Sequence, residues 1–536
     1  MLRARGPYRS TLLCVLCQVF VTAALPSSAS SGSRGGGGGG GSAAAASASL
    51  TVDLSAPALR TVFDTYLSVN IDTGSLYNNL DFTSPPLREL TRALARGAPL
   101  QLRIGGGAAD DTVYTGAGGA RGNCSGGAGL PPGVNICVDD SLWAELSDFA
   151  GATGARLVWD LNLAVNRTSA TQPWDSRNAA ALIAHAATTR SSPWAWQLGN
   201  EIEDWYKRNP PLNLTGARLA ADYAALRALL LAHAPAVSTR VYGPDACCEE
   251  RHTPQGGMLH DFAAQAASLS LAAITFHEYP LPRAADRSCL PQGYQNMSEI
   301  RGYLAAAIDT YAGYAAPALA AGVPLVLGET ATTALGGCDG LSNRFVAGFT
   351  FIHTLGAAAE RGVAQVNRQD LVGWSSQTTP SSYALLGAPG WSRGAIAPHP
   401  DYWIGILWKQ LLGSAVLASA LDNADVDAHV WCAARGGGAV VVTYANPLAE
   451  ELLLALPPAL AALPREEYLL QASPDAANIT ADATALNGAP LAATPEGRFA
   501  YPLPGRQSPP AAAAQLPPFS LGFLVFAGAR AAACGA

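Results

Sequence analysis

The strongest constraint on the fold is an alternation of short apolar runs with Ala- and Leu-rich stretches between about residues 66 and 370. Eight runs have strand character, and their starts lie 33 to 56 residues apart. This spacing is typical of repeated strand–helix units, in which parallel strands form one sheet that the helices cover. The expected strands are 66–72, 99–106, 155–163, 194–201, 240–245, 273–279, 324–330 and 364–369, and the expected helices include 176–188, 217–233, 299–316 and 343–361.

A second region of different character begins near residue 415. Its short β-type runs, at 427–433, 439–444, 466–471 and 519–526, are separated by Pro- and Gly-rich turns. This pattern favours an antiparallel β-sandwich. We therefore predict an α/β protein with a (β/α)8 TIM barrel at 61–412 and an appended C-terminal antiparallel β-sandwich domain at 413–536. A strand at 50–60, before the barrel, is expected to join the sandwich.

The first 30 residues have the features of a secretory signal peptide. Three arginines precede the apolar stretch 11–24, and small residues follow as far as Ser31. An uncleaved signal anchor is the alternative, but this stretch is shorter than the roughly 20 residues of a membrane span. Residues 31–49 read as a disordered Gly/Ser/Ala linker. We expect a secreted or extracellular protein, with the cell wall, a lysosome or vacuole, and a membrane surface left open as final locations.

Cysteine content agrees with the secretory route. Eight cysteines lie outside the signal, an even number typical of disulfide-bonded secreted chains, although their connectivity does not follow from the sequence. None has zinc-ligand spacing with His, so we expect no metal site. Five Asn-x-Ser/Thr acceptors predict glycosylation, at Asn123, Asn166, Asn213, Asn296 and Asn478.

The charge of the chain argues against nucleic acids and other polyanions as partners. The net charge of −7 disfavours nucleic-acid or polyanion binding that is driven by overall charge. We expect a carbohydrate substrate, no nucleic acid, no obligate protein partner and no cofactor.

Two glutamates close apolar runs at the expected barrel mouth. Glu201 ends the string WAWQLGNE, and Glu329 lies in PLVLGET. In a closed barrel the carboxyl ends of the fourth and seventh strands face each other, and catalytic residues gather at such ends. Glycoside hydrolysis needs a pair of carboxylic side chains at this kind of position. The alternative is that both are ordinary strand-end carboxylates held by Arg or Lys.

These motifs resemble glycoside hydrolase family 79, the heparanase-like β-glucuronidases, and are closer to the plant-type members than to animal heparanase. The resemblance covers about residues 50–536. Besides the two glutamate motifs it includes LRIGG at 102–106, WDSRN at 174–178, YGPD at 242–245, NRQ at 367–369, PHPDYW at 398–403 and the terminal FS…C.

The resemblance implies a secreted retaining β-glucuronidase that hydrolyses glucuronic-acid-bearing glycans or glycoconjugates by double displacement. In it Glu201 is the general acid/base and Glu329 the nucleophile. Asn200 is placed to bind the sugar 2-hydroxyl, and Tyr279 matches a tyrosine beside the nucleophile. Further substrate-binding residues implied by the resemblance are Asp72, Gly336, Gly337, Gln369 and Tyr383, the last four for the uronate carboxylate.

Some of these assignments have simpler alternatives. Gly336 and Gly337 also suit a plain turn, and Asp72 also suits a capping role at the barrel mouth. Tyr383 matches only if the preceding loop is longer than in the family. The resemblance further suggests a Cys432–Cys534 disulfide; Cys124–Cys137 is a reasonable local pair, and Cys289 and Cys338 follow the sixth and seventh strands, where they can also pair.

The chain departs from the family pattern at three places. Leu335 stands where the family has its first glycine after the nucleophile, and Cys247-Cys248 replaces polar residues. Lys207 and Lys409 are the only lysines, so the lysine clusters that grip heparan sulfate are missing. Two other functions therefore remain open: a retaining β-glycosidase for a neutral sugar, and a non-catalytic carbohydrate-binding barrel protein.

Overall fold

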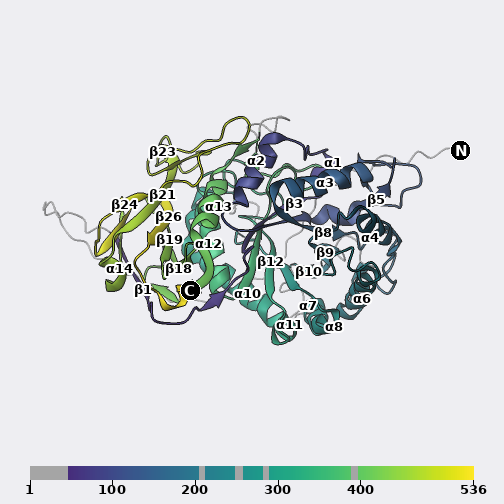
Figure 1. Ribbon diagram of the computed structural model, residues 1–536, viewed down its shortest axis with the longest axis horizontal. Coiled ribbons are helices and arrows are strands. Elements are labelled where there is room, and N and C mark those ends of the chain that lie inside the picture. Colours follow the sequence, from purple (N-terminus) through teal and green to yellow (C-terminus); the bar gives the residue numbers. More distant parts are fainter. Residues whose placement is uncertain (1–45, 204–211, 248–256, 282–288, 388–395, 536) are drawn as a thin grey trace, which may run out of the picture. The chain divides into compact units, whose positions relative to one another are not determined.

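A closed barrel of eight parallel strands lies at the centre of the computed structural model, which describes residues 46–203, 212–247, 257–281, 289–387 and 396–535 (Figure 1). A parallel bridge between Trp196 and Val241 joins the first and last strands and closes the sheet. The predicted (β/α)8 barrel is therefore confirmed. In hydrogen-bonded order its strands are β10 (Tyr242–Ala246), β11 (Ala273–His277), β12 (Leu325–Thr330), β13 (Val363–Arg368), β3 (Leu67–Asp72), β4 (Leu100–Gly105), β8 (Ala155–Leu161) and β9 (Ala195–Leu198).

Helices follow the barrel strands, and local capping fixes several of their starts. The Asp139 side chain accepts a hydrogen bond from the Leu142 N–H, and Thr215 and Asn296 cap α6 and α10 in the same way. The expected helix 343–361 begins only at Ala347. The main helices are α2 (Pro85–Leu94), α3 (Asp140–Thr153), α4 (Arg177–Thr189), α6 (Gly216–Ala232), α7 (Gly257–Ala263), α8 (Ala266–Leu269), α10 (Met297–Tyr314), α11 (Ala316–Ala320), α12 (Ala347–Glu360) and α13 (Pro400–Leu411). Shorter helices are α1 (Gly74–Tyr77), α9 (Pro291–Gln295), α14 (Pro458–Ala461), η1 (Gly107–Asp111) and η5 (Ala532–Cys534).

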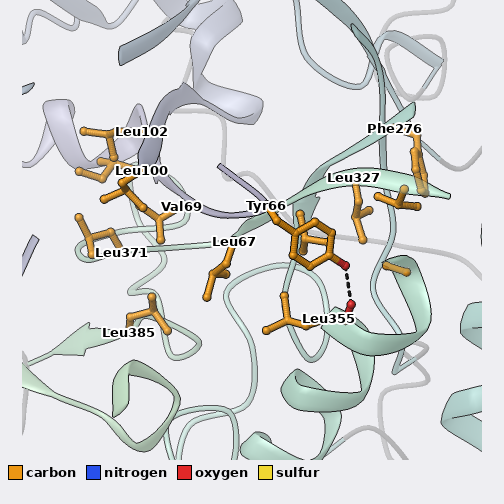
Figure 2. Close-up of a cluster of buried hydrophobic side chains, with 14 of the residues drawn as sticks. Tyr66, Leu67, Val69, Leu100, Leu102, Phe276, Leu327, Leu355, Leu371 and Leu385 are labelled. Atoms are coloured by element: carbon orange, nitrogen blue, oxygen red, sulfur yellow. Dashed lines mark hydrogen bonds between the residues drawn. The ribbon is translucent and has the colours of Figure 1, made fainter. Parts of the chain in front are cut away.

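A continuous hydrophobic core joins the barrel strands to these helices. Figure 2 shows Leu67 and Leu100, from β3 and β4, within this core. Tyr66, just before β3, is buried there, and its hydroxyl donates a hydrogen bond to the backbone carbonyl of Leu355 in α12. Burying the Tyr ring stabilises the contact, and the hydrogen bond satisfies its polar tip. The bottom of the barrel is thereby tied to α12.

The C-terminal region is a β-sandwich of two sheets. Val440 and Val442 of β19 face the core between the two sheets, whereas Val441 joins the core shared with the barrel helices. Because both faces of this strand are buried, its sequence is a continuous apolar run rather than an alternating one. One sheet contains, in order, β2 (Arg60–Thr61), β16 (Leu412–Leu417), β18 (Asp427–Ala433), β19 (Val440–Asn446), β26 (Ser520–Phe526), β21 (Arg465–Ser473), β22 (Ala483–Leu486) and β23 (Ala489–Pro490), with β24 (Arg506–Ser508) paired to β21. The other contains β17 (Ser419–Leu421), β1 (Ala46–Val52), β20 (Leu452–Ala455) and β25 (Ala513–Leu516).

The sandwich packs directly on the barrel through α12. Gly356 makes this approach possible, because a Cβ at that position would lie 1.9 Å from the ring of His429 in β18. No helix among the described residues has the length and apolar character that a membrane span requires.

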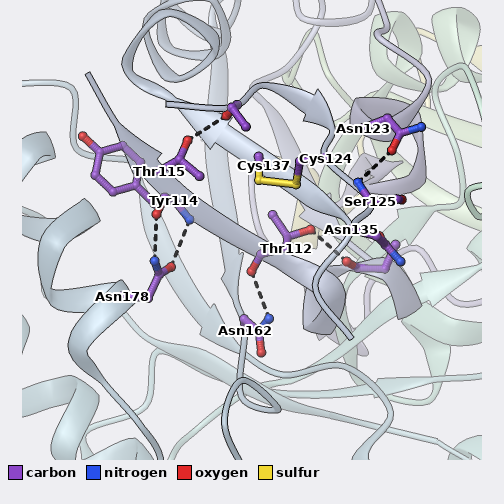
Figure 3. The surroundings of a disulfide bond; sticks show 12 residues. Thr112, Tyr114, Thr115, Asn123, Cys124, Ser125, Asn135, Cys137, Asn162 and Asn178 are labelled. Atoms are coloured by element: carbon purple, nitrogen blue, oxygen red, sulfur yellow. Dashed lines mark hydrogen bonds between the residues drawn. A yellow bond between two sulfur atoms is a disulfide. The ribbon is translucent and has the colours of Figure 1, made fainter. Parts of the chain in front are cut away.

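A small three-stranded sheet, which the sequence did not predict, follows β4. It consists of β5 (Thr112–Gly116), β7 (Ile136–Asp139) and β6 (Gly122–Asn123), and the disulfide Cys124–Cys137 closes it (Figure 3). Asn178 of α4 bonds both backbone groups of Tyr114, and Asn162 donates to the carbonyl of Thr112. These bonds hold the sheet at the carboxyl end of the barrel. Two two-residue strands, β14 (Leu386–Gly387) and β15 (Ala397–Pro398), form a further pair.

Two more disulfides complete the three pairs that the sequence and the resemblance suggested, Cys289–Cys338 and Cys432–Cys534. Cys247 is buried, and Cys248 lies outside the described residues. The five predicted glycosylation sites, Asn123, Asn166, Asn213, Asn296 and Asn478, all have exposed side chains, so glycan attachment there stays a prediction.

Candidate active site

The two glutamates reach the barrel mouth in different ways. Glu329 is part of β12, whereas β9 ends at Leu198 and the chain turns before it reaches Glu201. Gly199 and Glu201 both have positive φ angles, of 76° and 49°, and the Glu201 N–H donates to the carbonyl of Asp245. The expected strand 194–201 thus runs three residues too far at its carboxyl end. After this turn, Oε1 of Glu201 lies 3.0 Å from Nδ1 of His277, at the end of β11.

The two carboxylates lie close together around one imidazole. An oxygen of Glu201 and an oxygen of Glu329 are within 4.8 Å of each other. The Nδ1 atom of His277 lies 3.0 Å from Oε1 of Glu201 and 3.8 Å from Oε2 of Glu329. Retaining glycosidases hold their carboxyl groups about 5–5.5 Å apart, and inverting enzymes about 6.5–9.5 Å. The spacing fits the retaining class.

Arg103 lies beneath this pair and was missed by the sequence analysis. Its guanidinium is 1% exposed, and it donates to Oε2 of Glu329 at 3.1 Å, to Oδ1 of Asn200 at 2.7 Å and to Oδ2 of Asp245 at 2.8 Å. Gln197 and Asp160 accept further bonds from it. A buried guanidinium surrounded by acceptors holds these side chains in fixed positions.

The charges of this cluster shift the pKa values of its buried groups. Burial alone would raise the pKa of Asp245, but the Arg103 charge and the contacts with His277 outweigh burial and hold this pKa well below its usual range. Burial would likewise lower the pKa of His277, but the charge of Glu329 and the neighbouring Asp245 and Glu201 raise it to about 10. Asp160 is farther from the guanidinium, and burial raises its pKa. His277 is therefore an imidazolium and Asp245 a carboxylate at neutral pH.

Tyr279 contacts Glu329 directly, in the position that the resemblance implies. Its hydroxyl donates to Oε1 of Glu329 at 2.6 Å. Burial and the charge of Glu329 raise the pKa of Tyr279, so the phenol stays protonated and remains a donor. Its ring stacks on that of Tyr383, with centroids 6.2 Å apart. The structure thus links Tyr383 to Glu329 through Tyr279.

Gly336 and Gly337 lie on the loop after β12 and pack against the segment that carries Tyr383. Both have positive φ angles, of 91° and 80°. A Cβ on Gly337 would lie 3.1 Å from the Cβ of Tyr383, and Gly336 accepts a hydrogen bond from the Ser382 N–H at 2.7 Å. Leu335 also has a positive φ, of 60°, which suits the glycine that the family has there.

Asp72 and Gln369 line the same side of the barrel mouth. Asp72 is buried at the end of β3, where Oδ1 accepts from the Gly74 N–H; burial and the charge of Glu329 raise its pKa. Gln369 directly follows β13, and its Oε1 is buried with no hydrogen-bond partner among the described residues. Burial also raises the pKa of the adjacent Asp370, to about 7. An unpaired buried acceptor costs free energy unless a ligand or water binds it, so Gln369 is a candidate ligand contact.

Asn200 is held from two directions. Its side chain accepts from Arg103, and its backbone N–H donates to Oδ2 of Asp110 at 3.1 Å. Asp110 belongs to η1, after β4, and its Oδ1 also accepts from the Leu163 N–H. One carboxyl group therefore links the turns that follow β8 and β9. It fixes the segment that carries Asn200 and Glu201.

The structure brings all the predicted site residues to one end of the barrel and adds several that were not predicted. The sequence contains only a weak indication of these unpredicted residues. A charged residue within an apolar strand needs buried partners, and Arg103 is such a residue. His277 and Asp245 lie in the predicted strands 273–279 and 240–245, a position that does not by itself assign them a role. The added residues are Arg103, Asp110, Asp160, Asp245 and His277.

Among the residues that the structure describes, two groups of side chains have donor atoms close enough for a metal ion. The first is Glu201, His277 and Glu329, where the Arg103 guanidinium and the His277 imidazolium already supply positive charge. The second is the buried trio of His353, Asp427 and His429 between α12 and β18. Hydrolysis by two carboxylic side chains needs no metal.

Comparisons with known proteins bear on the family and the fold of the chain. The model of "Glycosyl hydrolase family 79, N-terminal domain" matches residues 65–356, more than half of the chain. Heparanase of Gallus gallus is 32% identical over 291 residues, a match that spans 54% of this chain and only 51% of that relative. Heparanase-like protein 1 of Arabidopsis thaliana is 24% identical over 367 residues, covering 64% of this chain and 61% of the relative. The chain thus spans between half and two thirds of the length of these two relatives.

A solved structure shares the fold. The crystal structure of a 4-O-α-L-rhamnosyl-β-D-glucuronidase from Fusarium oxysporum superposes with a TM-score of 0.60 at 17% identity. The superposition covers 89% of this chain and 100% of the other. At this identity the likeness concerns the barrel-and-sandwich architecture alone.

Proposed function

The chain belongs to glycosyl hydrolase family 79, and from that premise we propose that it is a retaining β-glucuronidase. The observation that carries the proposal is the carboxylate pair. Glu201 and Glu329 have oxygens within 4.8 Å of each other, and Tyr279 and Arg103 both donate to Glu329. This arrangement provides an ionised nucleophile beside a second carboxyl group that can carry a proton.

The first step forms a covalent glycosyl-enzyme. Glu329 attacks the anomeric carbon while Glu201 donates a proton to the glycosidic oxygen, so that the β-glycosidic bond breaks and an alcohol leaves. Tyr279 and Arg103 hold Glu329 in line for this attack. Asn200, fixed by Arg103 and Asp110, is placed to bind the sugar 2-hydroxyl, a contact that strengthens in the transition state.

The second step hydrolyses this intermediate. Esterification removes the negative charge of Glu329, and Glu201, now a carboxylate, takes a proton from the attacking water. The sugar leaves with its original β configuration, and Glu201 is protonated again. No cofactor enters either step.

Glu201→Gln should separate substrates by their leaving groups. An amide cannot donate the proton, so kcat/KM for an alkyl glucuronide should fall about 10²–10⁴-fold. An aryl glucuronide with an acidic phenol needs little acid help at this step and should lose far less. Initial rates on a matched pair of substrates check this, and equal losses on both would contradict the assignment of Glu201 as acid.

The uronate specificity rests on the residues beside the nucleophile. We propose that the backbone amides of Gly336 and Gly337, with Tyr383 and Gln369, bind the sugar carboxylate. The packing of the Gly pair on the Tyr383 segment supports this. In Gln369 the side-chain NH2 is the donor for the carboxylate, and the buried Oε1, an acceptor, suits a sugar hydroxyl. The raised pKa values of Asp72 and Asp370 keep these acids from repelling a uronate at mildly acidic pH.

One observation favours a neutral sugar instead. Asp72 and Asp370 are buried carboxyl groups close enough to Glu329 to feel its charge, and such groups also suit binding of sugar hydroxyls. A panel of p-nitrophenyl β-glucuronide, β-glucoside and β-xyloside separates the two. We expect a kcat/KM at least about 10²-fold higher for the glucuronide, because a site built for a polar group rejects analogues that lack it. A faster glucoside or xyloside would replace the glucuronidase proposal with the neutral-sugar one.

We also propose that the protein travels the secretory route and acts on extracellular glycans or glycoconjugates. Three disulfides support this, because such bonds persist in oxidising compartments. The signal-like segment lies within residues 1–45, outside the described residues.

A further inference from the structure

One imidazole lies between the two catalytic glutamates, and the two steps above give it no task. His277 ends β11 and pairs in register with Glu329 of β12. Its side chain is 1% exposed. Nδ1 lies 3.0 Å from Oε1 of Glu201, and Nε2 lies 3.6 Å from Oδ1 of Asp245. The ring is therefore clamped between three carboxyl groups, contributed by three neighbouring strand ends.

The charges around this ring favour its protonated form. Carboxyl groups face it from β9 through Glu201, from β10 through Asp245, from β12 through Glu329 and, at greater distance, from β8 through Asp160. The charged group of β4 in this cluster is the guanidinium of Arg103, which pairs with Asp160, Asp245 and Glu329. A second cation in the cluster reduces the repulsion that remains.

We propose that His277, as an imidazolium, is the positioning residue of the acid/base: its Nδ1–H binds Oε1 of Glu201 and leaves the catalytic proton on Oε2. This inference rests on the proposed retaining mechanism. An oxygen that accepts a hydrogen bond from a cation binds a proton less favourably than the other oxygen of the same carboxyl group. The proton of Glu201 is therefore carried by Oε2 rather than by Oε1. His277 thereby selects which oxygen faces the leaving group.

The imidazolium also acts on the product of the first step. Glu201 gives its Oε2 proton to the glycosidic oxygen and becomes a carboxylate, which the Nδ1–H of His277 stabilises. In the second step a proton from the attacking water returns to Oε2. His277 keeps both of its ring protons throughout, so every proton that moves is accounted for by Glu201, the substrate and water.

His277→Asn tests this role, because Asn keeps a short N–H donor but removes the positive charge. We expect kcat/KM for an alkyl glucuronide to fall about 10- to 100-fold and that for an aryl glucuronide with an acidic phenol to change little. We also expect the alkaline limb of the kcat/KM profile to move up by about one pH unit or more, because a nearby cation no longer favours the carboxylate form of the acid.

His353→Asn is the matched control. His353 is equally buried, and its Nδ1 lies 3.0 Å from an oxygen of Asp427 at the contact of α12 with the sandwich, outside the site. This variant should leave both the leaving-group dependence and the alkaline limb unchanged. A His277→Asn variant that kept the wild-type alkaline limb, or lost activity equally on both substrates, would overturn the inference.

The wild-type protein provides a second test if His277→Asn does not fold. The chain has eight histidines, and ¹⁵N NMR should show that one imidazole is still doubly protonated at pH 8. The pKa of this imidazole should fall when a 2-fluoroglucuronyl group esterifies Glu329. Absence of such a signal would contradict the inference. If the wild type cleaves no aryl β-glycoside, the proposed function is wrong. If it cleaves one but lacks this signal, only the inference about His277 is wrong.

Discussion

Replacing Glu329 by Gln is expected to lower kcat at least about 10⁴-fold on every β-glycoside, whatever its leaving group. The amide has nearly the same shape but cannot form the covalent bond to the anomeric carbon, and no other described carboxyl group stands in its place opposite Glu201. Initial rates with a fluorogenic aryl glucuronide measure the loss over the required range. Glu360→Gln, at the end of α12 and bonded to His429, is a control that should retain wild-type kcat.

Glu329→Ala with added azide extends this result. Azide can enter the space that the carboxylate leaves and attack the anomeric carbon from the same face, which gives an α-glycosyl azide and restores part of the rate. A Glu329→Gln protein that kept more than about 1% of wild-type activity would contradict the assignment, as would a rescued product of β configuration.

Arg103→Met should both destabilise the protein and inactivate it. Removing the guanidinium leaves Asp245 and Glu329 buried without their main cationic partner, which should cost about 3–5 kcal/mol of unfolding free energy. The same change removes a donor to Glu329 and frees Asn200, so kcat/KM should fall at least about 10²-fold. Urea denaturation followed by tryptophan fluorescence and assays of the folded fraction measure the two effects separately.

Arg167→Met provides the comparison for Arg103. Arg167 and Asp222 form another fully buried pair, which joins the segment after β8 to α6. Its loss should destabilise the protein, by less than the loss of Arg103 because Arg218 still pairs with Asp222, and should leave kcat/KM of the folded fraction within about threefold of wild type. If Arg103→Met behaved in the same way, Arg103 would be a stability residue alone.

The barrel could be predicted from the sequence because the same pattern, a short apolar strand followed by a helix, recurs along the chain. Most of the parallel strands are short runs rich in apolar residues, and the eight runs recur at the spacing of one strand and one helix. The small sheet β5–β7–β6 was missed because its strands are short and its loop is rich in glycine. The end of β9 was misplaced because Gly199 and Glu201 leave the extended conformation in a turn that apolar character does not reveal.

Residues of the candidate site could be predicted only where a side chain suited to catalysis stands at the end of a predicted strand. Glu201 and Glu329 stand out as acids at the ends of apolar runs, and Tyr279 follows from the resemblance. Arg103 and His277 could not be assigned, because their roles depend on partners from strands far away in the sequence, which only the closed barrel brings together. The uronate-binding roles of Gly336, Gly337, Gln369 and Tyr383 stay predictions.

Covalent trapping tests the central claim most directly. The protein would be incubated with an activated 2-deoxy-2-fluoroglucuronide, which slows the second step more than the first, and then analysed by intact mass and peptide mapping. The retaining mechanism predicts one glucuronyl group per chain, attached to Glu329 and absent from Glu329→Gln. A label on another residue, or turnover of the reagent to an α-configured product with no adduct, would contradict it.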